Sequence, residues 1–327
     1  MEIAHAVSID YFSNPEFITE VTARPTEPPL QPLLWPEATA MKFLGSCLSV
    51  ACIFLFVVEI QAQKTAIASP ARTGAIPFRL VGGFLIEVEG GIGHLEGLKF
   101  ILDTGTTYSV VDRRIANRFS AAHRSEKVFN FDRFVSVDRM EFPDVHFGPV
   151  AVDNVSMRVT ELAKLSNLIP DADAIIGLDL LKTASKLDIL YDSKMVLLIP
   201  RNAVTEDTSE PERFKCLTVQ VIIQDHPIEL IFDTGREGVL LYEDRIRKHI
   251  PDIRLTDVRN AHEGRLRGKI ARLPGLRLGG PESDTEVFLI PAPRADLAPD
   301  IDGALGTVPL KANRIELDFV GGALRWR

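Results

Sequence analysis

Several chemistries find no support in this chain because the residues they need are missing. The 327 residues include three cysteines, and two of them, Cys47 and Cys52, lie in an apolar stretch near the start. Cys216 is then alone in the expected folded part, where no intrachain disulfide can form and a small core residue is its predicted role. The sequence also has no Cys/His cluster with metal-ligand spacing, no phosphate-binding glycine loop and no Gly-x-Ser-x-Gly motif.

Positive charge is also in short supply. The chain has 37 Lys and Arg against 45 Asp and Glu, a formal net charge of −8. Nucleic-acid-binding domains carry a basic surface, so we expect no nucleic-acid partner. A composition with 46% hydrophobic and 25% charged residues is typical of a globular protein. The length is sufficient for two packed units of about 120 residues each.

The first part of the chain does not have a globular pattern. Residues 1–40 are rich in proline and contain one basic residue, so we expect disorder there, or a start codon placed too early. Residues 43–58 are apolar and uncharged, which makes 41–63 either a signal peptide, with translation beginning at Met41, or a short membrane anchor. Either alternative predicts an extracytoplasmic protein, secreted, periplasmic or anchored through 43–58. Residues 64–76 are expected to be a tether.

The most informative feature is a short string that occurs twice. Residues 100–106 read Phe-Ile-Leu-Asp-Thr-Gly-Thr, and residues 230–236, 130 positions later, read Leu-Ile-Phe-Asp-Thr-Gly-Arg. An apolar pair and a basic helical stretch follow each copy. A second string, at 170–177, matches 299–306 at an offset of 129 positions. Landmarks in the same order at nearly constant offset indicate an internal duplication.

With these motifs the chain resembles the bacterial retropepsin-like aspartic proteases, with two lobes in one polypeptide as in the pepsin-like enzymes. The likeness covers about 77–327. It implies an all-β fold of two β-barrel lobes with a cleft between them, and short strands with few helices fit that class. We place lobe one at 77–200, a polar linker at 201–213 and lobe two at 214–327.

The resemblance assigns the catalytic role to Asp103 and Asp233. Two adjacent carboxylates cannot both ionise easily and therefore share one proton. The ionised one takes a proton from water while the protonated one donates to the peptide carbonyl, so no cofactor or metal is expected. The expected supporting residues are Thr104, Gly105, Thr106, Thr234, Gly235 and Arg236 around the dyad, with Gly177 and Gly306 packed beneath the two loops. The resemblance also implies that Thr104 and Thr234 cross-bond the loops.

Arg236 departs from the family's pattern, which usually has Ser, Thr or Ala after the Gly. One alternative is that its guanidinium favours the ionised form of Asp233 and lowers the first apparent pKa of the dyad. In that case replacing Arg236 with Ser should move the acidic limb of the pH-rate profile upward. The other alternative is that the side chain turns outward and pairs with Glu237 or Glu243.

The expected flaps, hairpins that cover the substrate, form a second departure. Residues 260–272, with Gly264 and Gly268, predict such a hairpin in lobe two. Its basic residues either form a solvated face or favour the binding of acidic peptides near the cleft. The corresponding stretch of lobe one, 127–142, has no Gly and no Tyr. Its aromatic residues, Phe129, Phe131 and Phe134, either cover the cleft or pack in the core.

The sequence therefore predicts a hydrolase, an extracytoplasmic aspartic endopeptidase that cleaves peptide or protein substrates as a monomer. Two alternatives remain. The first is a weak or inactive pseudo-protease that binds peptides outside the cell. The second is a dimer in which Asp-Thr-Gly sites act across the interface.

Overall fold

The computed structural model describes residues 74–120, 123–130, 133–165, 169, 171–201, 217–263, 266–278, 281–292 and 301–327. The predicted signal peptide or anchor, Cys216 and nearly all of the predicted linker lie outside these residues. Among the described helices, none has the length and apolar character needed to cross a membrane.

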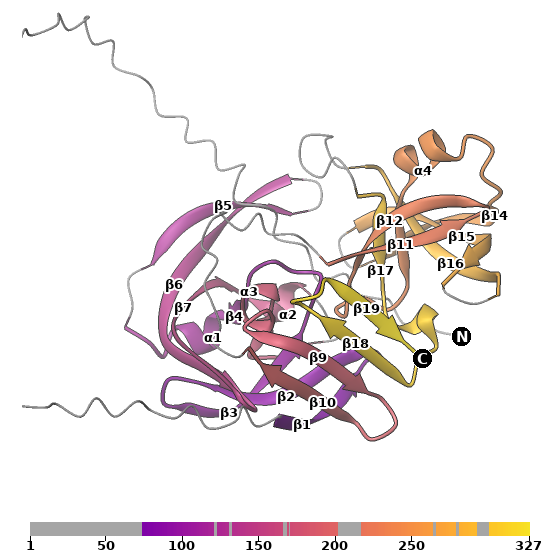
Figure 1. Ribbon diagram of the computed structural model, residues 1–327. Coiled ribbons are helices and arrows are strands. Elements are labelled where there is room, and N and C mark those ends of the chain that lie inside the picture. Colours follow the sequence, from indigo (N-terminus) through magenta and orange to yellow (C-terminus); the bar gives the residue numbers. More distant parts are fainter. Residues whose placement is uncertain are drawn as a thin grey trace, which may run out of the picture. The chain divides into compact units, whose positions relative to one another are not determined.

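Strands dominate the described chain, as predicted for an all-β protein (Figure 1). The strands before the predicted linker are β1 (Gly74–Val81), β2 (Leu85–Ile92), β3 (Leu95–Leu102), β4 (Val110–Asp112), β5 (Arg124–Asn130), β6 (Arg133–Phe147), β7 (Val150–Thr160), β8 (Ala174–Ile176), β9 (Ala184–Leu190) and β10 (Met195–Pro200). Those after it are β11 (Thr218–Ile223), β12 (His226–Phe232), β13 (Val239–Tyr242), β14 (Thr256–Glu263), β15 (Leu266–Arg277), β16 (Ser283–Ile290), β17 (Gly303–Leu305), β18 (Arg314–Asp318) and β19 (Ala323–Trp326). The helices are short: α1 (Arg113–Ala116), α2 (Leu162–Leu165), α3 (Leu178–Leu181), α4 (Glu243–His249) and the 3-10 turn η2 (Val308–Leu310).

Two rings of six strands repeat the same order of pairing. The first ring runs β2-β3-β8-β4-β7-β6 and closes by pairing of β2 with β6. The second ring runs β11-β12-β17-β13-β16-β15 and closes by pairing of β11 with β15. The parallel pairings also correspond, β3–β8 with β12–β17 and β4–β7 with β13–β16. The prediction of a duplicated, two-lobed all-β fold is therefore confirmed.

The strand that leads into each Asp-Thr-Gly string is buried on both faces. The last three residues of β3 are at most 1% exposed, and β8, its parallel neighbour, is buried throughout. A strand with neighbours on both edges and apolar packing on both faces accommodates a continuous apolar run rather than an alternating one. The apolar triplets of the sequence therefore fix where these two strands lie and where they end.

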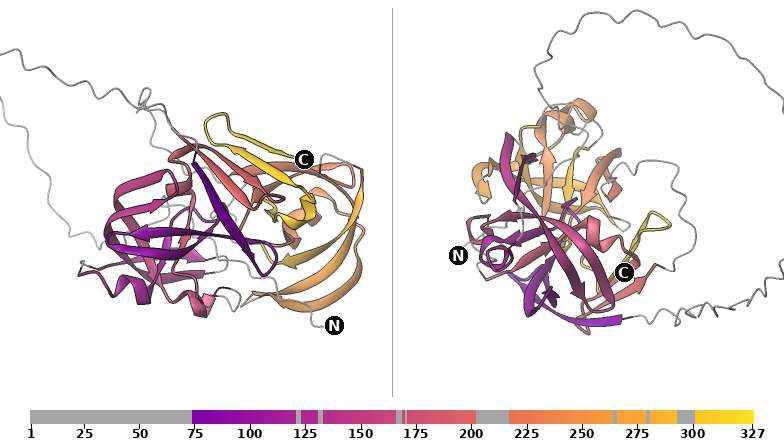
Figure 2. Two further views of the ribbon diagram at one scale, coloured as in Figure 1. Left: turned by 90° about the horizontal axis from the view of Figure 1, so that it is seen from below. Right: turned by 90° about the vertical axis from the view of Figure 1, so that its left-hand side faces the viewer.

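The C-terminal hairpin of β18 and β19 belongs to the larger sheet. Strand β18 pairs with β9, with Ile315 opposite Ile189 and Leu317 opposite Leu187. The sheet then has twelve strands in the order β19-β18-β9-β10-β1-β2-β3-β8-β4-β7-β6-β5, and Figure 2 shows the yellow hairpin beside the strands of the first half. The sequence-based lobe boundary had assigned this hairpin to lobe two. Its inward residues, both fully buried, instead cover a core that both rings share.

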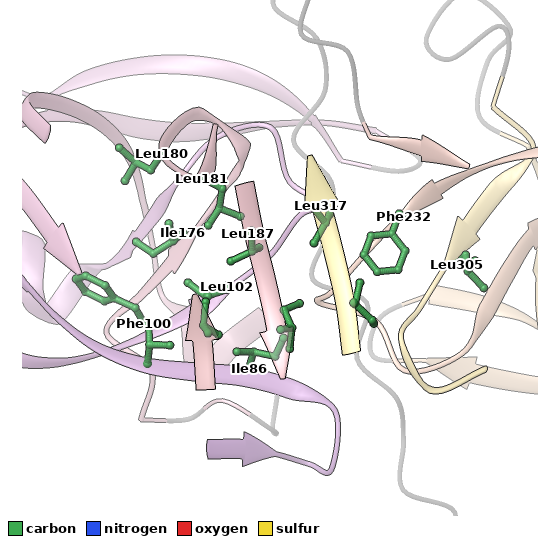
Figure 3. Close-up of a cluster of buried hydrophobic side chains, with 14 of the residues drawn as sticks. Ile86, Phe100, Leu102, Ile176, Leu180, Leu181, Leu187, Phe232, Leu305 and Leu317 are labelled. Carbon is green, nitrogen blue, oxygen red and sulfur yellow. The ribbon is translucent and has the colours of Figure 1, made fainter. Parts of the chain in front are cut away.

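One apolar cluster links the two rings. Figure 3 shows Leu102 of the first ring, Leu187 and Leu317 of the shared strands, and Phe232 of the second ring within this cluster. Leu102 and Phe232 are the residues directly before Asp103 and Asp233 in the sequence. Close packing in such a core leaves little freedom to its members. The cluster therefore positions both Asp-Thr-Gly strings at once.

Three glycines close together, Gly90, Gly91 and Gly93, lie at the end of β2 and in the turn that follows it. Gly90 and Gly91 belong to strand β2, and only Gly93 lies in the turn, with φ of 56°. A Cβ on Gly90 would lie 2.3 Å from the ring of Phe100, so this glycine makes room for an aromatic side chain of the neighbouring strand.

Candidate active site

Asp103 and Asp233 occupy corresponding places at the ends of β3 and β12. The backbone N–H of Asp103 donates to the carbonyl of Ile176 at 3.0 Å, and that of Asp233 donates to the carbonyl of Leu305 at 3.0 Å. The chain beyond β8 and β17 then supports each loop from below. The two Asp residues are thus delivered by the same backbone contacts.

Reciprocal hydrogen bonds hold the two loops together. The backbone N–H of Thr104 donates to Oγ1 of Thr234 at 3.0 Å, and the N–H of Thr234 donates to Oγ1 of Thr104 at 3.1 Å. Each hydroxyl also donates to a carbonyl of the opposite strand, Thr104 to Phe232 at 2.9 Å and Thr234 to Leu102 at 2.8 Å. All four bonds are buried and join residues of a single chain. They fix the separation of the two Asp residues.

Glycine at positions 105 and 235 creates the space in which the carboxyl groups meet. The N–H of Gly105 donates to Oδ1 of Asp103, and that of Gly235 to Oδ1 of Asp233, both at 2.8 Å. A Cβ on Gly105 would lie 2.4 Å from Oδ1 of Asp233, and one on Gly235 would lie 2.7 Å from Oδ2 of Asp103. No real Cβ approaches so closely. Each glycine therefore makes room for the carboxyl group of the opposite loop.

The two carboxyl groups form an electrostatically coupled pair. Asp103 is fully buried and Asp233 is 1% exposed. Burial raises the pKa of Asp103 well above its usual range, and the charge of Asp233 and a hydrogen bond to its side chain raise it further. The N–H of Gly105, and to a smaller degree that of Thr106, lowers the pKa but does not offset burial and the charge of Asp233. Two carboxyl groups so close together cannot both ionise easily, which favours a state in which the pair holds one proton.

Gly177 and Gly306 lie where the chain passes directly under the two loops. A Cβ on Gly177 would lie 2.7 Å from the carbonyl carbon of Tyr108. One on Gly306 would lie 2.4 Å from the carbonyl oxygen of Arg236. The following residue bonds to the loop above, since Leu178 donates to the carbonyl of Thr106 at 2.9 Å and its counterpart Thr307 donates to that of Arg236 at 3.3 Å.

The side chain of Arg236 is buried and does not turn outward. It is 1% exposed, whereas the side chain of Glu243, one of its two expected partners, accepts hydrogen bonds from Lys269 and Arg247 at 2.8 and 3.1 Å. The charge of Arg236 lowers the pKa of Glu237, which burial nevertheless raises above its usual value. The side chain of Arg236 is therefore not solvent-facing, although its charge does act on Glu237, one of the two partners expected for it. A buried cation lies in the loop that carries Asp233.

The first ring contains a polar network that sequence reasoning missed. Oγ of Ser109 donates to Oδ1 of Asp179 at 2.6 Å, and the N–H of Ser109 donates to Oδ2 at 2.9 Å. The N–H of Gly177 donates to Oγ of Ser109 at 3.0 Å, which connects the network to the support beneath Asp103. Burial raises the pKa of Asp179, although its hydrogen bonds lower it. Ser109 and Asp179 are 70 positions apart, so no local pattern pairs them.

Each ring carries a corresponding hairpin. The predicted hairpin at 260–272 forms from β14 and β15, and β5 and β6 form its counterpart in the first ring. Gly264, Phe131 and the side chains of Phe129 and Phe134 lie outside the described part. Basic residues of the β14–β15 hairpin pair with acids, in the ion pairs Lys269–Glu243, Arg259–Glu286 and Arg272–Asp257. This pairing weakens the case for a preference for acidic peptides.

Comparison with known proteins gives a structural match. No family model matches the chain, and no curated protein matches it. Among solved structures, the chain is similar to the crystal structure of a retropepsin-like aspartic protease from Rickettsia conorii. That match has 16% sequence identity, covers 39% of this chain and 92% of the other, and has a TM-score of 0.29.

Proposed function

We propose that this protein is an aspartic endopeptidase in which Asp103 and Asp233 activate water for peptide hydrolysis. One observation carries the proposal: duplicated loops of one chain, joined by reciprocal threonine hydrogen bonds, bring two buried carboxyl groups together. A structural carboxylate pair of this kind is costly, because burial disfavours charge and like charges repel. Catalysis gives a reason to keep it.

The chemistry follows from the unequal protonation of the pair. The ionised carboxylate accepts a proton from water as the water attacks the peptide carbonyl, and the protonated partner donates to the carbonyl oxygen. The tetrahedral intermediate then collapses with cleavage of the C–N bond: the leaving amine takes a proton from the dyad, and a hydroxyl of the intermediate returns one to it. General acid–base catalysis of this type contributes about 10²- to 10⁴-fold, and fixed geometry contributes further. The glycine N–H groups and the threonine cross-bonds supply that geometry.

A monomer is the proposed active form. Both Asp residues and all four cross-bonding groups come from one chain, so the dyad requires no second copy. The extracytoplasmic location stays a proposal based on the sequence of 41–63. Sequencing the N-terminus of the protein isolated from its host would test it, with a start after about residue 60 as the expected result for a cleaved signal.

The function is tested by incubating the purified protein with a peptide library from about pH 3 to pH 7 and identifying the cleaved bonds by mass spectrometry. Asp103→Asn and Asp233→Asn should each lose at least about 10³-fold of the activity, and the double variant should be no worse than either, because the two act as a unit. Asp153→Asn, which removes an exposed carboxylate, is the matched control. Peptide binding without cleavage by the parent would instead favour the peptide-binding alternative.

A further inference from the structure

A buried arginine on β7 lies against the loop that carries Asp103. Arg158 is 6% exposed, and its Cζ lies 3.3 Å from the centroid of the Tyr108 ring. Its Nε donates to Oε1 of Glu126 at 2.6 Å. Removing two charges from water costs several kcal/mol per ion unless close pairing compensates. The stacked ring and the short ion pair together provide such pairing.

The three residues come from three separate elements. Glu126 lies on β5, at the outer edge of the sheet, and Arg158 lies on β7, with β6 between the two strands. Tyr108 lies just beyond the Asp-Thr-Gly string, after Thr107, and its carbonyl accepts a hydrogen bond from Oγ1 of Thr106 at 3.1 Å. The ion pair thus links the edge of the β5–β6 hairpin to the loop of Asp103 across an intervening strand.

Arg158 also joins the network beneath that loop. Its backbone N–H donates to the carbonyl of Ser109 at 3.0 Å. Its charge lowers the pKa of Asp179, the carboxyl group that receives both polar groups of Ser109. A series of contacts therefore runs from Glu126 through Arg158 to the support of Asp103.

The second ring has other residues at each corresponding place. Strand register aligns Arg158 with Phe288, because Val110 is opposite Arg158 and Leu240 is opposite Phe288. The duplication aligns Tyr108 with Gly238, which offers no ring on which an arginine could stack. There the hairpin is joined to β16 by Arg259 and Glu286, whose side chains are 47% and 59% exposed, and to α4 by Lys269 and Glu243, whose side chains are 43% and 20% exposed. Exposed pairs of this kind contribute little.

We propose that Arg158 is a positioning residue that anchors the β5–β6 hairpin to the Asp103 loop, leaving the β14–β15 hairpin as the more mobile of the two. The consequence for substrate rests on the proposed function. If the β5–β6 hairpin is held against the Asp103 loop, it moves little when a peptide binds. The β14–β15 hairpin is then the one that closes over the peptide. The anchor itself is a property of the folded chain and is measurable without any substrate.

Hydrogen exchange of the whole protein tests the anchor. Glu126→Gln and Arg158→Met should speed amide exchange in 124–128 and 136–139 by about tenfold or more, because each leaves a buried charged partner without its ion pair. Exchange in β14 and β15 should stay as in the parent. The matched control Glu286→Gln makes the same chemical change in the exposed pair and should leave the β5–β6 hairpin unaltered. Equal acceleration in both hairpins, or none in β5, would overturn the proposal.

Kinetics separates the anchor from the proposed function. If the parent cleaves peptides, Glu126→Gln should raise KM several-fold with a smaller change in kcat, since a loosened wall binds the peptide less well. A general loss of folded protein would lower kcat and leave KM unchanged, which would contradict a positioning role. Arg158→Lys keeps the charge but not the planar stack, and should fall between the parent and Arg158→Met. If no peptide is cleaved, the exchange experiment still decides for or against the anchor.

Discussion

The two Asp-Thr-Gly loops of this protein share a framework but differ in their surroundings. Both have the same strand-end contact, the same glycine N–H bond to the carboxyl group and the same threonine cross-bonds. Around the first lies the buried polar pair of Ser109 and Asp179, whereas Val239 and Val308 take the corresponding places in the second. The duplication has therefore preserved the contacts that place the carboxyl groups. The duplication has not preserved the polar and charged side chains that surround each loop.

Breaking the shared framework at the glycines should have the largest effect. Gly105→Ala and Gly235→Ala each place a methyl group within 2.4–2.7 Å of the opposite carboxyl group, so the loops must separate. We expect a loss of about 100-fold or more in cleavage and about 1–3 kcal/mol in stability, with Gly105→Ala the more severe. Gly238→Ala is the control, because its Cβ meets nothing within 4 Å. Normal activity in Gly105→Ala would contradict the packed dyad.

Substituting Thr104 and Thr234 tests whether the two loops contribute equally to the free energy of unfolding. Thr104→Val and Thr234→Val keep the side-chain shape, but each removes one accepted and one donated buried hydrogen bond. Each should therefore cost about 2–4 kcal/mol in the free energy of unfolding, with the two values within about 0.5 kcal/mol. Denaturant titration measures both. The control Thr107→Val, at a buried position in the same loop, should lower the free energy of unfolding by much less. If Thr104→Val and Thr234→Val differ greatly in that free energy, the two loops do not contribute equally to stability.

The coupled carboxyl groups of Asp103 and Asp233 should lower the free energy of unfolding at neutral pH. Because the pKa of Asp103 is raised in the folded state, its contribution to stability is fully present below about pH 3.8 and is lost as the pH rises through the folded value. Asp103→Asn removes this dependence. Thermal unfolding should show the variant more stable than the parent by more than about 1 kcal/mol at pH 7 and no more stable near pH 3. Parallel curves for the two proteins would contradict the raised pKa, and Asp153→Asn should give such parallel curves.

Buried Arg236 should determine the pH at which activity falls on the acidic side of the pH-rate profile. Arg236→Ser removes a positive charge three positions from Asp233 and should move the acidic limb of the pH-rate profile upward, by up to about one unit. Arg236→Met keeps the side-chain volume and should give the same shift, which separates charge from cavity effects. Arg247→Ser removes a half-exposed arginine of α4 and should leave the limb unchanged. An unchanged limb in both Arg236 variants would show that this cation does not act on the dyad.

Local pattern revealed the dyad but not its surroundings. An apolar triplet before Asp-Thr-Gly is a contiguous signal, and its repetition identified both strand ends and both acids. The pairs Glu126–Arg158 and Ser109–Asp179 lie 32 and 70 positions apart, and only the folded chain brings them together. The pairing of β18 with β9 likewise joins residues far apart in the sequence. Charged residues are expected at the surface, so only the packed structure reveals that Arg236 is buried.

The smallest predicted effect compares two equivalent ion pairs far from the dyad. In the first ring His146 faces Glu96 and Asp144 at 3.0 and 3.2 Å, and in the second ring Arg277, at the corresponding register, bonds to Asp225. Hydrogen bonding to Glu96, with a smaller contribution from Asp144, raises the pKa of His146. Its stabilisation is therefore complete below about pH 6.5 and is lost as the pH rises through the folded value.

Swapping these two cations makes that difference measurable. His146 is about one-third exposed, so solvent screening limits the effect to about 0.5 kcal/mol. Between about pH 5.5 and pH 8.5 the parent should lose that much more stability than His146→Arg, whose charge is permanent. The reciprocal variant Arg277→His should gain a similar pH dependence in the second ring. If both substitutions leave the pH dependence of unfolding unchanged, neither ion pair contributes to stability. The exchange of His146 for Arg277 between the rings then has no energetic consequence.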